Sequence, residues 1–297
     1  MPHAHASVAG ANQGRLAVVF TITLTVFGVE LVGGFLANSL ALIADAGHMF
    51  TDVAGIGLAL LAIRFASRPA TRNRTFGYLR LEILAAVVNA VLLFGVAAYV
   101  LIEAWRRLSE PPEVASGLML AVAIVGLAAN ATSLFLLRGA QHESLNMRGA
   151  YLEVMGDLAG SAAVIVAAVV IAMTGWTAAD AVASVIIGLL IIPRTWRLLR
   201  DAVDVLLEAT PKGVDLELVR SHILDAPGVS DVHDLHAWTI TSGMNVVSAH
   251  VVLKAAADSP AVLDHLCRCL SGDFDIEHST FQLESADRRR LEERSHA

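Results

Sequence analysis

Charged residues are scarce in this sequence. Only 16% of the 297 residues are Asp, Glu, Lys or Arg, whereas about 25% is usual in a soluble domain. More than half, 56%, are hydrophobic, and the mean hydropathy is +0.63. This composition argues against a soluble protein and favours a membrane domain, with enough length left for a small soluble domain. The net charge of -7 argues against nucleic acid as a partner.

Cysteine is rare, and two common signals are missing. The only cysteines, Cys267 and Cys269, are too close together to bridge comfortably, so they indicate reduced thiols rather than a disulfide framework. No Gly-rich phosphate loop ending in Lys-Ser or Lys-Thr occurs, which disfavours a nucleotide-driven pump. The first 15 residues are polar and the apolar segment after them is too long for a cleavable signal peptide, so none is expected.

Six long apolar segments predict six membrane-spanning helices, because a helix needs about 20 mostly apolar residues to cross the hydrocarbon. The segments run roughly over residues 16–36, 41–65, 81–105, 117–137, 150–171 and 178–196. The links between them are short, which favours antiparallel neighbours in one all-α transmembrane bundle.

Arginines are distributed unevenly over these links. Those on one side are Arg64, Arg68, Arg72, Arg74, Arg80, Arg138 and Arg148, and those on the other side are Arg106 and Arg107. By the positive-inside rule, both termini face the cytoplasm, and a multi-pass protein of the cell membrane is expected. A cytoplasmic tail, 1–15, then precedes a transmembrane domain, 16–208.

The composition changes after Pro193, and a soluble domain is expected over residues 209–285, followed by a charged tail, 286–297. A turn signal at residues 210–213 opens the soluble domain. Hydrophobic periodicity predicts a helix, two strands, a helix and a strand, at 214–224, 232–240, 245–253, 261–270 and 275–284. This α-β-β-α-β order predicts a small two-layer α+β domain.

Ionisable residues interrupt two of the spans. Asp45, His48 and Asp52 fall at i, i+3 and i+7 on one stripe of the second helix, and Glu153 and Asp157 fall at i, i+4 in the fifth. An acid at the centre of a membrane helix costs about 2.5–3.5 kcal/mol, so these residues should face the bundle interior and have partners. Two helices that each present two ligands supply four donors, enough for a tetrahedral divalent cation.

The alternative is a buried salt-bridge network. It is disfavoured because the membrane segments contain no lysine and their arginines lie near the span ends, which leaves the acids uncompensated. Asp45 is a candidate for the exit path or for a partner of the ligands. Asn89 and Asn130 are expected to form interhelical hydrogen bonds, with contact to the ion as the alternative. Glycines such as Gly47 and Gly160 are expected to let the second and fifth helices approach closely.

Four stretches carry a resemblance to a known family: SLALIADAGHMFTDV, RTFGYLRLEILAAVVNA, LNMRGAYLEVMGD and DVHDLHAWTITSGMNVVSAHVVL. They resemble the cation diffusion facilitators, specifically the bacterial zinc, cadmium and cobalt efflux branch, over nearly the whole chain. The resemblance implies a secondary active transporter rather than an enzyme, a homodimeric six-span exporter with a cytoplasmic ferredoxin-like domain. It implies exchange of cytosolic Zn²⁺ for H⁺ through a transport site of His48, Asp52, Glu153 and Asp157.

The chain departs from the family pattern at two places. The zinc branch usually has histidine at the position of Glu153, and glutamate is a harder ligand. Co²⁺, Fe²⁺, Mn²⁺ and Cd²⁺ are therefore alternatives to Zn²⁺. Leu79 stands where relatives often carry histidine, and residues 67–75 contain none, so no metal site is expected in that loop.

The resemblance also suggests a regulatory Zn²⁺ site in the soluble domain. His233 and His250 match family positions that bind zinc in some members, and they are expected on adjacent strands. Further candidate ligands are His278, Glu284 and His265, with His3 or His5 reaching in from the N-terminus. A surface or packed histidine is the alternative for each. His236 and Trp238 are expected to pack, and the two thiols to be buried.

Two rival functions also fit buried metal ligands. A membrane metallohydrolase needs an open coordination position for water and usually a separate general base, and the chain has no His-Glu-x-x-His motif. A receptor that binds metal without moving it would have a similar sequence, and only a flux measurement distinguishes it from a transporter.

Overall fold

The computed structural model describes residues 3–66, 71–138, 145–274, 276 and 278–289. Within these ranges, the side chains of residues 3–16, 52, 55–63, 66 and 145–150 are not described. The chain divides into two compact units, Met1–Leu60 with Ala85–Leu199 and Leu61–Leu84 with Arg200–Ala297.

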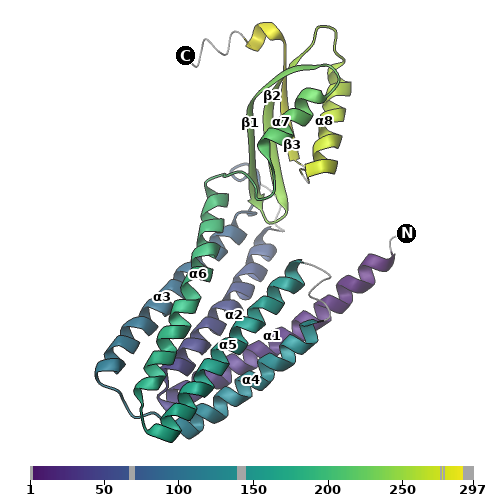
Figure 1. Ribbon diagram of the computed structural model, residues 1–297. Coiled ribbons are helices and arrows are strands. Elements are labelled where there is room, and N and C mark those ends of the chain that lie inside the picture. The colour runs from purple at the N-terminus through teal and green to yellow at the C-terminus, as the bar shows by residue number, and fades with distance from the viewer. Residues whose placement is uncertain (1–2, 67–70, 139–144, 275, 277, 290–297) are drawn as a thin grey trace. The chain divides into compact units, whose positions relative to one another are not determined.

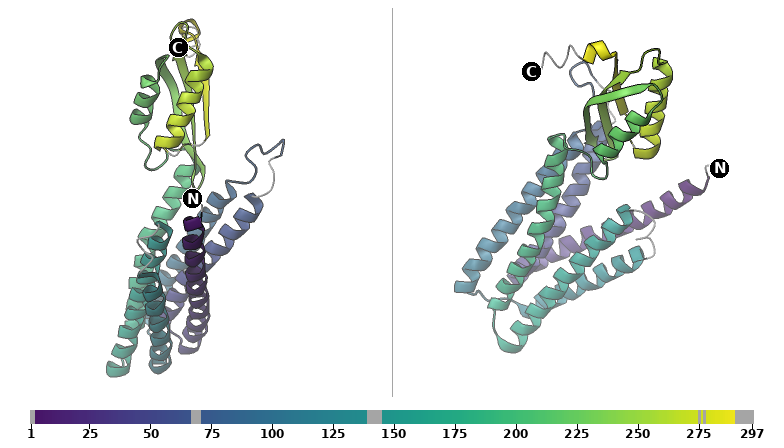
Figure 2. Two further views of the ribbon diagram at one scale, coloured as in Figure 1. Left: turned by 90° about the vertical axis from the view of Figure 1, so that its right-hand side faces the viewer. Right: turned by 45° about the horizontal axis from the view of Figure 1, so that its top comes forward.

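Six helices form a bundle (Figures 1 and 2). They are α1 (His3–Ala37), α2 (Leu40–Ala66), α3 (Leu81–Ser109), α4 (Ser116–Arg138), α5 (Leu145–Thr174) and α6 (Ala178–Leu206). Five of them contain stretches long and apolar enough to cross a membrane, and the described part of α2 contributes the shorter apolar stretch Leu40–Thr51. The predicted all-α bundle is confirmed, although its helices extend beyond the predicted spans.

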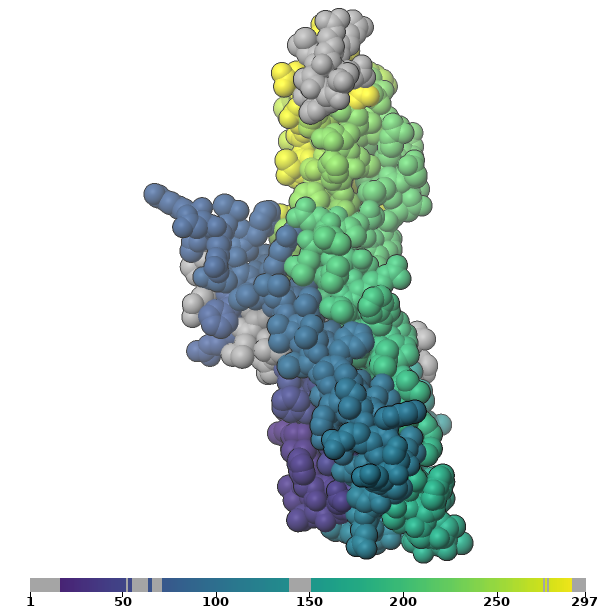
Figure 3. Space-filling model, turned by 90° about the vertical axis from the view of Figure 1, so that its left-hand side faces the viewer, coloured from purple at the N-terminus to yellow at the C-terminus, as the bar shows by residue number. Residues whose placement is uncertain are grey.

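Small and branched apolar side chains fill the interior of the bundle. The buried cluster draws on all six helices and contains many alanines, which let the helices approach closely. Large apolar side chains point outward instead, among them Ile102 and Trp105 of α3 and Leu189 and Leu190 of α6. Figure 3 shows α3 (blue) beside α6 (green) on one face of the bundle. An apolar outer surface of this kind suits contact with lipid.

An acidic residue of α6 fixes the start of α2. Asp180 is buried, and its carboxylate accepts hydrogen bonds from the Ser39 hydroxyl at 2.6 Å and from the Leu40 amide at 2.7 Å. The first amides of a helix have no partner within the helix, so a carboxylate there satisfies them and interacts favourably with the helix dipole. This contact ties α2 to α6 and sets where the helix that carries His48 begins.

The C-terminal domain contains a three-stranded sheet. Its elements are α7 (Leu216–Asp225), β1 (Val229–Thr241), β2 (Met244–Leu253), α8 (Ser259–Phe274) and β3 (His278–Glu284). The strand order is β1-β2-β3, with β1 antiparallel to β2 and β2 parallel to β3. The predicted α-β-β-α-β order and the α+β class are confirmed.

Alternation along β2 places its side chains on two faces of the sheet. Val247, Ala249 and Val251 share one buried core with residues of α7 and α8. Both helices therefore cover this face of the sheet (Figure 2). His250, one position out of phase, lies on the opposite face.

Candidate metal centres

In the membrane bundle, α2 and α5 bring a histidine and an aspartate together. His48 and Asp157 are buried, at 9% and 4% exposure, and Nε2 of His48 lies 3.6 Å from Oδ1 of Asp157. Donor atoms on one tetrahedral zinc lie about 3.3–3.6 Å apart, given bond lengths of about 2.0–2.2 Å. The observed separation fits a shared ion, and both residues are predicted ligands on the two helices predicted to meet.

The third predicted ligand, Glu153, is half-exposed and paired with an arginine. Arg194 of α6 donates a hydrogen bond from Nη2 to Oε1 of Glu153, and its Nη1 lies 3.4 Å from Nε2 of His48. The expectation that no cation lies near these acids is therefore wrong. Arg194 comes from close to a span end, and its long side chain extends back to the site. Its guanidinium compensates Glu153 and lies where it can compete with a metal ion.

The fourth predicted ligand, Asp52, belongs to α2, but its side chain lies outside the described residues. Gly160 of α5 lies close to α2, because a Cβ added there would lie 2.7 Å from Oδ1 of Asp45. Gly47 serves a different contact, since a Cβ there would meet Val96 of α3 at 2.7 Å. The prediction that Gly47 lets α2 and α5 approach each other is wrong.

Further polar residues lie buried in the bundle, and sequence reasoning missed one of them. Glu30 of α1 is fully buried, and neither carboxylate oxygen has a hydrogen-bond partner among the described residues. Asp45 and Asn130 are both 2% exposed, and Asn130 donates from Nδ2 to the Ser161 hydroxyl at 3.3 Å. This bond links α4 to α5, as predicted for Asn130. Asn89 is 9% exposed, and its Oδ1 has no partner within the described part of the chain.

In the C-terminal domain, the sheet face opposite the helices carries three candidate ligands. His233 on β1 pairs directly with His250 on β2, and the buried Glu284 ends β3 beside them. Nδ1 of His250 lies 2.9 Å from Oε1 of Glu284, and Nε2 of His233 lies 3.3 Å from Oε2. One ligand atom from each residue lies within 4.8 Å of the other two. Two imidazoles and a carboxylate form a donor set typical of zinc.

Asp234 lies next to this cluster because β1 is irregular at this point. The strand register shifts between His233 and His236, and Asp234 has a φ of 50°, in the left-handed region. A hydrogen bond with Nε2 of His236 at 3.0 Å lowers the pKa of Asp234, and the neighbouring histidines act in the same direction. Oδ2 of Asp234 lies 3.7 Å from Nε2 of His250. His236 is exposed, so the prediction that it packs is wrong.

The other predicted ligands of this domain do not join the cluster. His278 is exposed at the start of β3, at the opposite end of the strand from Glu284. His265 is exposed on α8. The side chains of His3 and His5 lie outside the described residues.

The two cysteines are half-buried on α8 rather than fully buried as predicted. Cys269 forms a second group of three candidate ligands with His222 and Asp273, whose ligand atoms also lie within 4.8 Å of one another. Burial and the neighbouring Asp273 raise the pKa of the Cys269 thiol. A thiol with a raised pKa must lose its proton before it binds a metal, which weakens this group at neutral pH.

Comparison with known proteins decides the family. Residues 16–207 match the family model of the cation efflux transmembrane domain, and residues 211–286 match that of the cation efflux protein cytoplasmic domain. The chain belongs to the cation efflux family. This family membership makes it a metal cation efflux transporter and a multi-pass membrane protein.

Three curated relatives of this cation efflux protein show how far the similarity extends. The chain is 48% identical to the metal cation efflux system protein CzcD of Cupriavidus metallidurans, over 93% of this chain and 88% of that protein. It is 43% identical to the zinc transporter ZitB of Escherichia coli, over 96% of this chain and 93% of that protein. It is 40% identical to the cadmium, cobalt and zinc/H(+)-K(+) antiporter of Bacillus velezensis, over 96% and 93% respectively.

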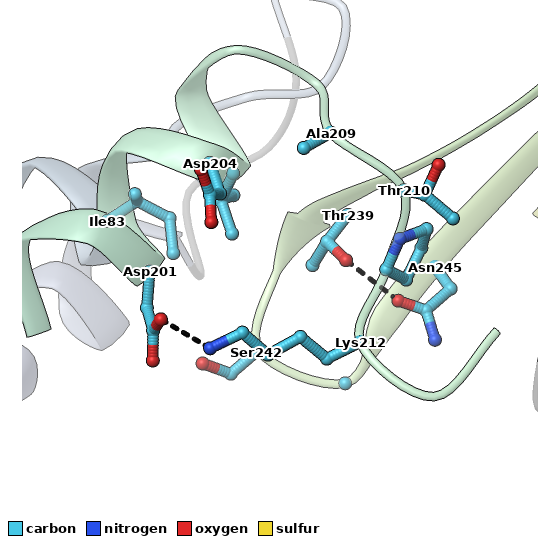
Figure 4. A pocket seen from close by; sticks show the side chains of 12 residues that line it. Ile83, Asp201, Asp204, Ala209, Thr210, Lys212, Thr239, Ser242 and Asn245 are labelled. Atoms are coloured by element: carbon cyan, nitrogen blue, oxygen red, sulfur yellow. Dashed lines mark hydrogen bonds and ion pairs between the residues drawn. The ribbon is translucent and has the colours of Figure 1, made fainter. Parts of the chain in front are cut away.

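The cation efflux protein also has a cavity of about 350 Å³ in the unit that contains the C-terminal domain (Figure 4). Asp201 and Lys212 form an ion pair at its wall, and Thr239 donates to Oδ1 of Asn245 at 2.9 Å. None of the predicted ligands lines this cavity. Its lining contains no histidine or cysteine, and Asp201 is already paired with Lys212, so it is not a candidate metal centre.

Proposed function

We propose that this protein exports Zn²⁺ from the cytosol in exchange for H⁺, by alternating access of the transmembrane domain, residues 16–208. The approach of His48 to Asp157 across α2 and α5 is the observation that carries this proposal. The arginine-rich links support a cell-membrane orientation with both termini in the cytoplasm. A relative named as an antiporter, with H⁺ among its ions, supports the exchange.

Competition between Zn²⁺ and protons for the same ligands couples zinc export to proton import. A metal ligand must be deprotonated to bind, so Zn²⁺ and H⁺ compete for the same lone pairs at His48, Asp52, Glu153 and Asp157. A site open to the cytosol, with deprotonated ligands, captures the ion. After the bundle rocks, protons from the other side displace it. His48 is proposed as a proton carrier because its imidazole nitrogen can bind either the metal ion or a proton.

Arg194 acts as a counter-ion for the carboxylate of Glu153 when no metal is bound. Its guanidinium pairs with Glu153 and lies 3.4 Å from Nε2 of His48, so it occupies lone pairs that the metal also needs. Zn²⁺ must open this pair to bind Glu153. When the ion leaves, the pair re-forms and Glu153 is again compensated. Arg194 therefore keeps the affinity of the site low enough for release.

Residue 153 determines the metal preference in this account. Glu153→His is expected to raise Zn²⁺ flux severalfold relative to Co²⁺ and Mn²⁺, because imidazole is a softer ligand and leaves Arg194 without its acidic partner. Competition between these ions for uptake into proteoliposomes measures the order, with Glu110→His, at an exposed site, as the control. An unchanged order would place the selection elsewhere in the protein. Uptake itself also excludes a receptor that binds metal without moving it.

The C-terminal domain, residues 209–285, dimerises and senses cytosolic zinc in this account. Zn²⁺ held by His233, His250 and Glu284 stiffens the open face of the sheet, and Asp234 lies beside this group, with its Oδ2 3.7 Å from Nε2 of His250. Zinc bound here pulls the domains of a homodimer together and biases the membrane halves.

Replacing both His233 and His250 with alanine is expected to remove this regulation. The zinc concentration needed to stimulate flux should rise by about tenfold or more, because two of the three ligands are lost. Flux measured against free Zn²⁺ in proteoliposomes tests this. The matched control is His265→Ala with His278→Ala, which removes two exposed histidines outside the cluster. Identical zinc dependence in both double variants would exclude regulation through this site.

A further inference from the structure

A second polar cluster lies about one helical turn from the transport site. Asp45 precedes His48 by three residues on α2, and Ser161 follows Asp157 by four residues on α5. Asp45 therefore lies closer than His48 to the start of α2, and Ser161 lies closer than Asp157 to the end of α5. Since α2 and α5 are antiparallel, these two helix ends lie on the same side of the bundle, and both residues are displaced from the transport site in the same direction.

Glu30 of α1 faces this cluster across a space that Gly126 of α4 leaves open. A Cβ added at Gly126 would collide with Oε1 of Glu30 and would lie 3.5 Å from the Ser161 hydroxyl. Ser161 also hydrogen-bonds with Asp45 and accepts a hydrogen bond from Asn130. Oxygen atoms of Glu30, Asp45 and Ser161 therefore gather in one small region between α1, α2, α4 and α5.

The carboxylates in this region are buried and incompletely partnered. Glu30 is 0% exposed and Asp45 2%. Both carboxylate oxygens of Glu30, and Oδ2 of Asp45, have no hydrogen-bond partner in the described part of the chain. Asp45 and Asp157 are close enough to act on Glu30 electrostatically. Buried carboxylates without partners are costly, and a cation between Glu30 and Asp45 would satisfy them together.

We propose that Glu30, Asp45 and Ser161 form a second divalent-cation site in the bundle, distinct from the His48–Asp157 site. Its donors are all oxygens, whereas the transport site includes an imidazole. An all-oxygen set holds zinc-like ions less strongly than a set with imidazole. The ion can therefore pass on, as conduction through successive sites requires. That the ion occupies this site after the transport site, on its way out, rests on the proposed direction of export. The capacity of the site to bind an ion does not.

The test counts bound ions on the full-length protein in detergent, with Cd²⁺ as the probe and equilibrium dialysis as the measurement. Glu30→Gln keeps the size of the side chain and removes its charge, and it is expected to bind one Cd²⁺ per protomer fewer than the wild type. Gly126→Ala keeps every ligand, but its Cβ displaces the carboxylate of Glu30, so the same loss is expected. Glu110→Gln, at an exposed site, should bind the wild-type number. A single symmetrical peak in size-exclusion chromatography confirms that each variant is folded.

A second pair of variants separates this site from the transport site. Asp157→Asn should lose a different ion, so the double variant Glu30→Gln with Asp157→Asn should bind two fewer. A double variant that loses no more than Asp157→Asn alone would overturn the second site. A wild-type ion count in both Glu30→Gln and Gly126→Ala would also overturn it, and Glu30 would then take up a proton only. Wild-type flux in Asp157→Asn would instead refute the proposed transport site. The number of Cd²⁺ ions lost by Glu30→Gln would still test the second site.

Discussion

Replacing Asp157 with alanine is expected to lower metal flux to about a hundredth of the wild-type rate or less. Asp157 is buried and lies 3.6 Å from the imidazole of His48, so its loss removes one donor from a four-ligand site. Loss even of a residue that only supports a ligand commonly costs about 10–100-fold in affinity or activity. Asp52→Ala should have the same effect, because it removes the ligand one turn from His48. Zn²⁺ uptake into inverted vesicles, driven by a pH gradient, measures both.

The control for this experiment is Glu110→Ala, which removes an exposed carboxylate directly after α3. It should transport at the wild-type rate, and all three variants should reach the membrane in similar amounts. If both Asp157→Ala and Asp52→Ala took up Zn²⁺ at the wild-type rate under the pH gradient, the proposed transport site would be refuted.

Replacing Arg194 with glutamine is expected to tighten metal binding and slow release. The variant frees Glu153 from its guanidinium partner and removes a positive charge 3.4 Å from Nε2 of His48. A charge-assisted hydrogen bond is worth about 1.5–3 kcal/mol, and partial solvent exposure of this pair reduces that to about 1 kcal/mol. The Kd for Zn²⁺ should therefore fall about fivefold, and the maximal flux should fall because protons displace the ion less readily.

Arg197→Gln is the matched control for Arg194→Gln. Arg197 is exposed one turn further along α6, and its Nε hydrogen-bonds to the Pro193 carbonyl at 3.3 Å. It should leave both the Kd and the maximal flux unchanged. Isothermal titration calorimetry gives the Kd and proteoliposome uptake gives the flux. Weaker zinc binding in Arg194→Gln would mean that the arginine positions the ligands rather than competing with the ion.

Helical periodicity was sufficient to predict which membrane helices meet at the candidate site. His48 and Asp157 are costly in lipid, so each must face the interior, and the spacing of the polar residues orients α2 and α5 toward each other. The two side chains lie 3.6 Å apart in the structure. The side-chain arrangement of Glu153 did not follow, because its partner comes from α6 and sequence spacing carries no information on contacts between distant helices.

Three polar residues of the bundle escaped sequence reasoning, for two different reasons. Arg194 lies near the end of an apolar span, where arginines usually mark the membrane surface, and only its side-chain conformation carries it to Glu153. Glu30 is a lone acid in an apolar span, without a partner one turn away. Its signal was present, since an ionisable residue inside a span indicates function by itself. The role of Asp180 was missed for the same reason as that of Arg194, because a cap supplied by another helix is a tertiary contact.

The C-terminal domain shows a similar division between local and tertiary information. The alternation of the two strands and the tight turn between them predicted that His233 and His250 lie on adjacent strands, and the two are directly paired. The irregularity at Asp234 depends on a positive φ at a residue other than glycine. Such a conformation has no sequence signature that could have placed its carboxylate beside His250 or turned His236 outward.

Anomalous diffraction at the zinc absorption edge, from crystals of the full-length protein grown with Zn²⁺, tests whether His48 and Asp157 share one ion. We expect a peak between α2 and α5, with Nε2 of His48 and Oδ1 of Asp157 both about 2.0–2.2 Å from the ion. A membrane domain in which zinc binds away from these two atoms, or in which they remain too far apart to share one ion, would contradict it.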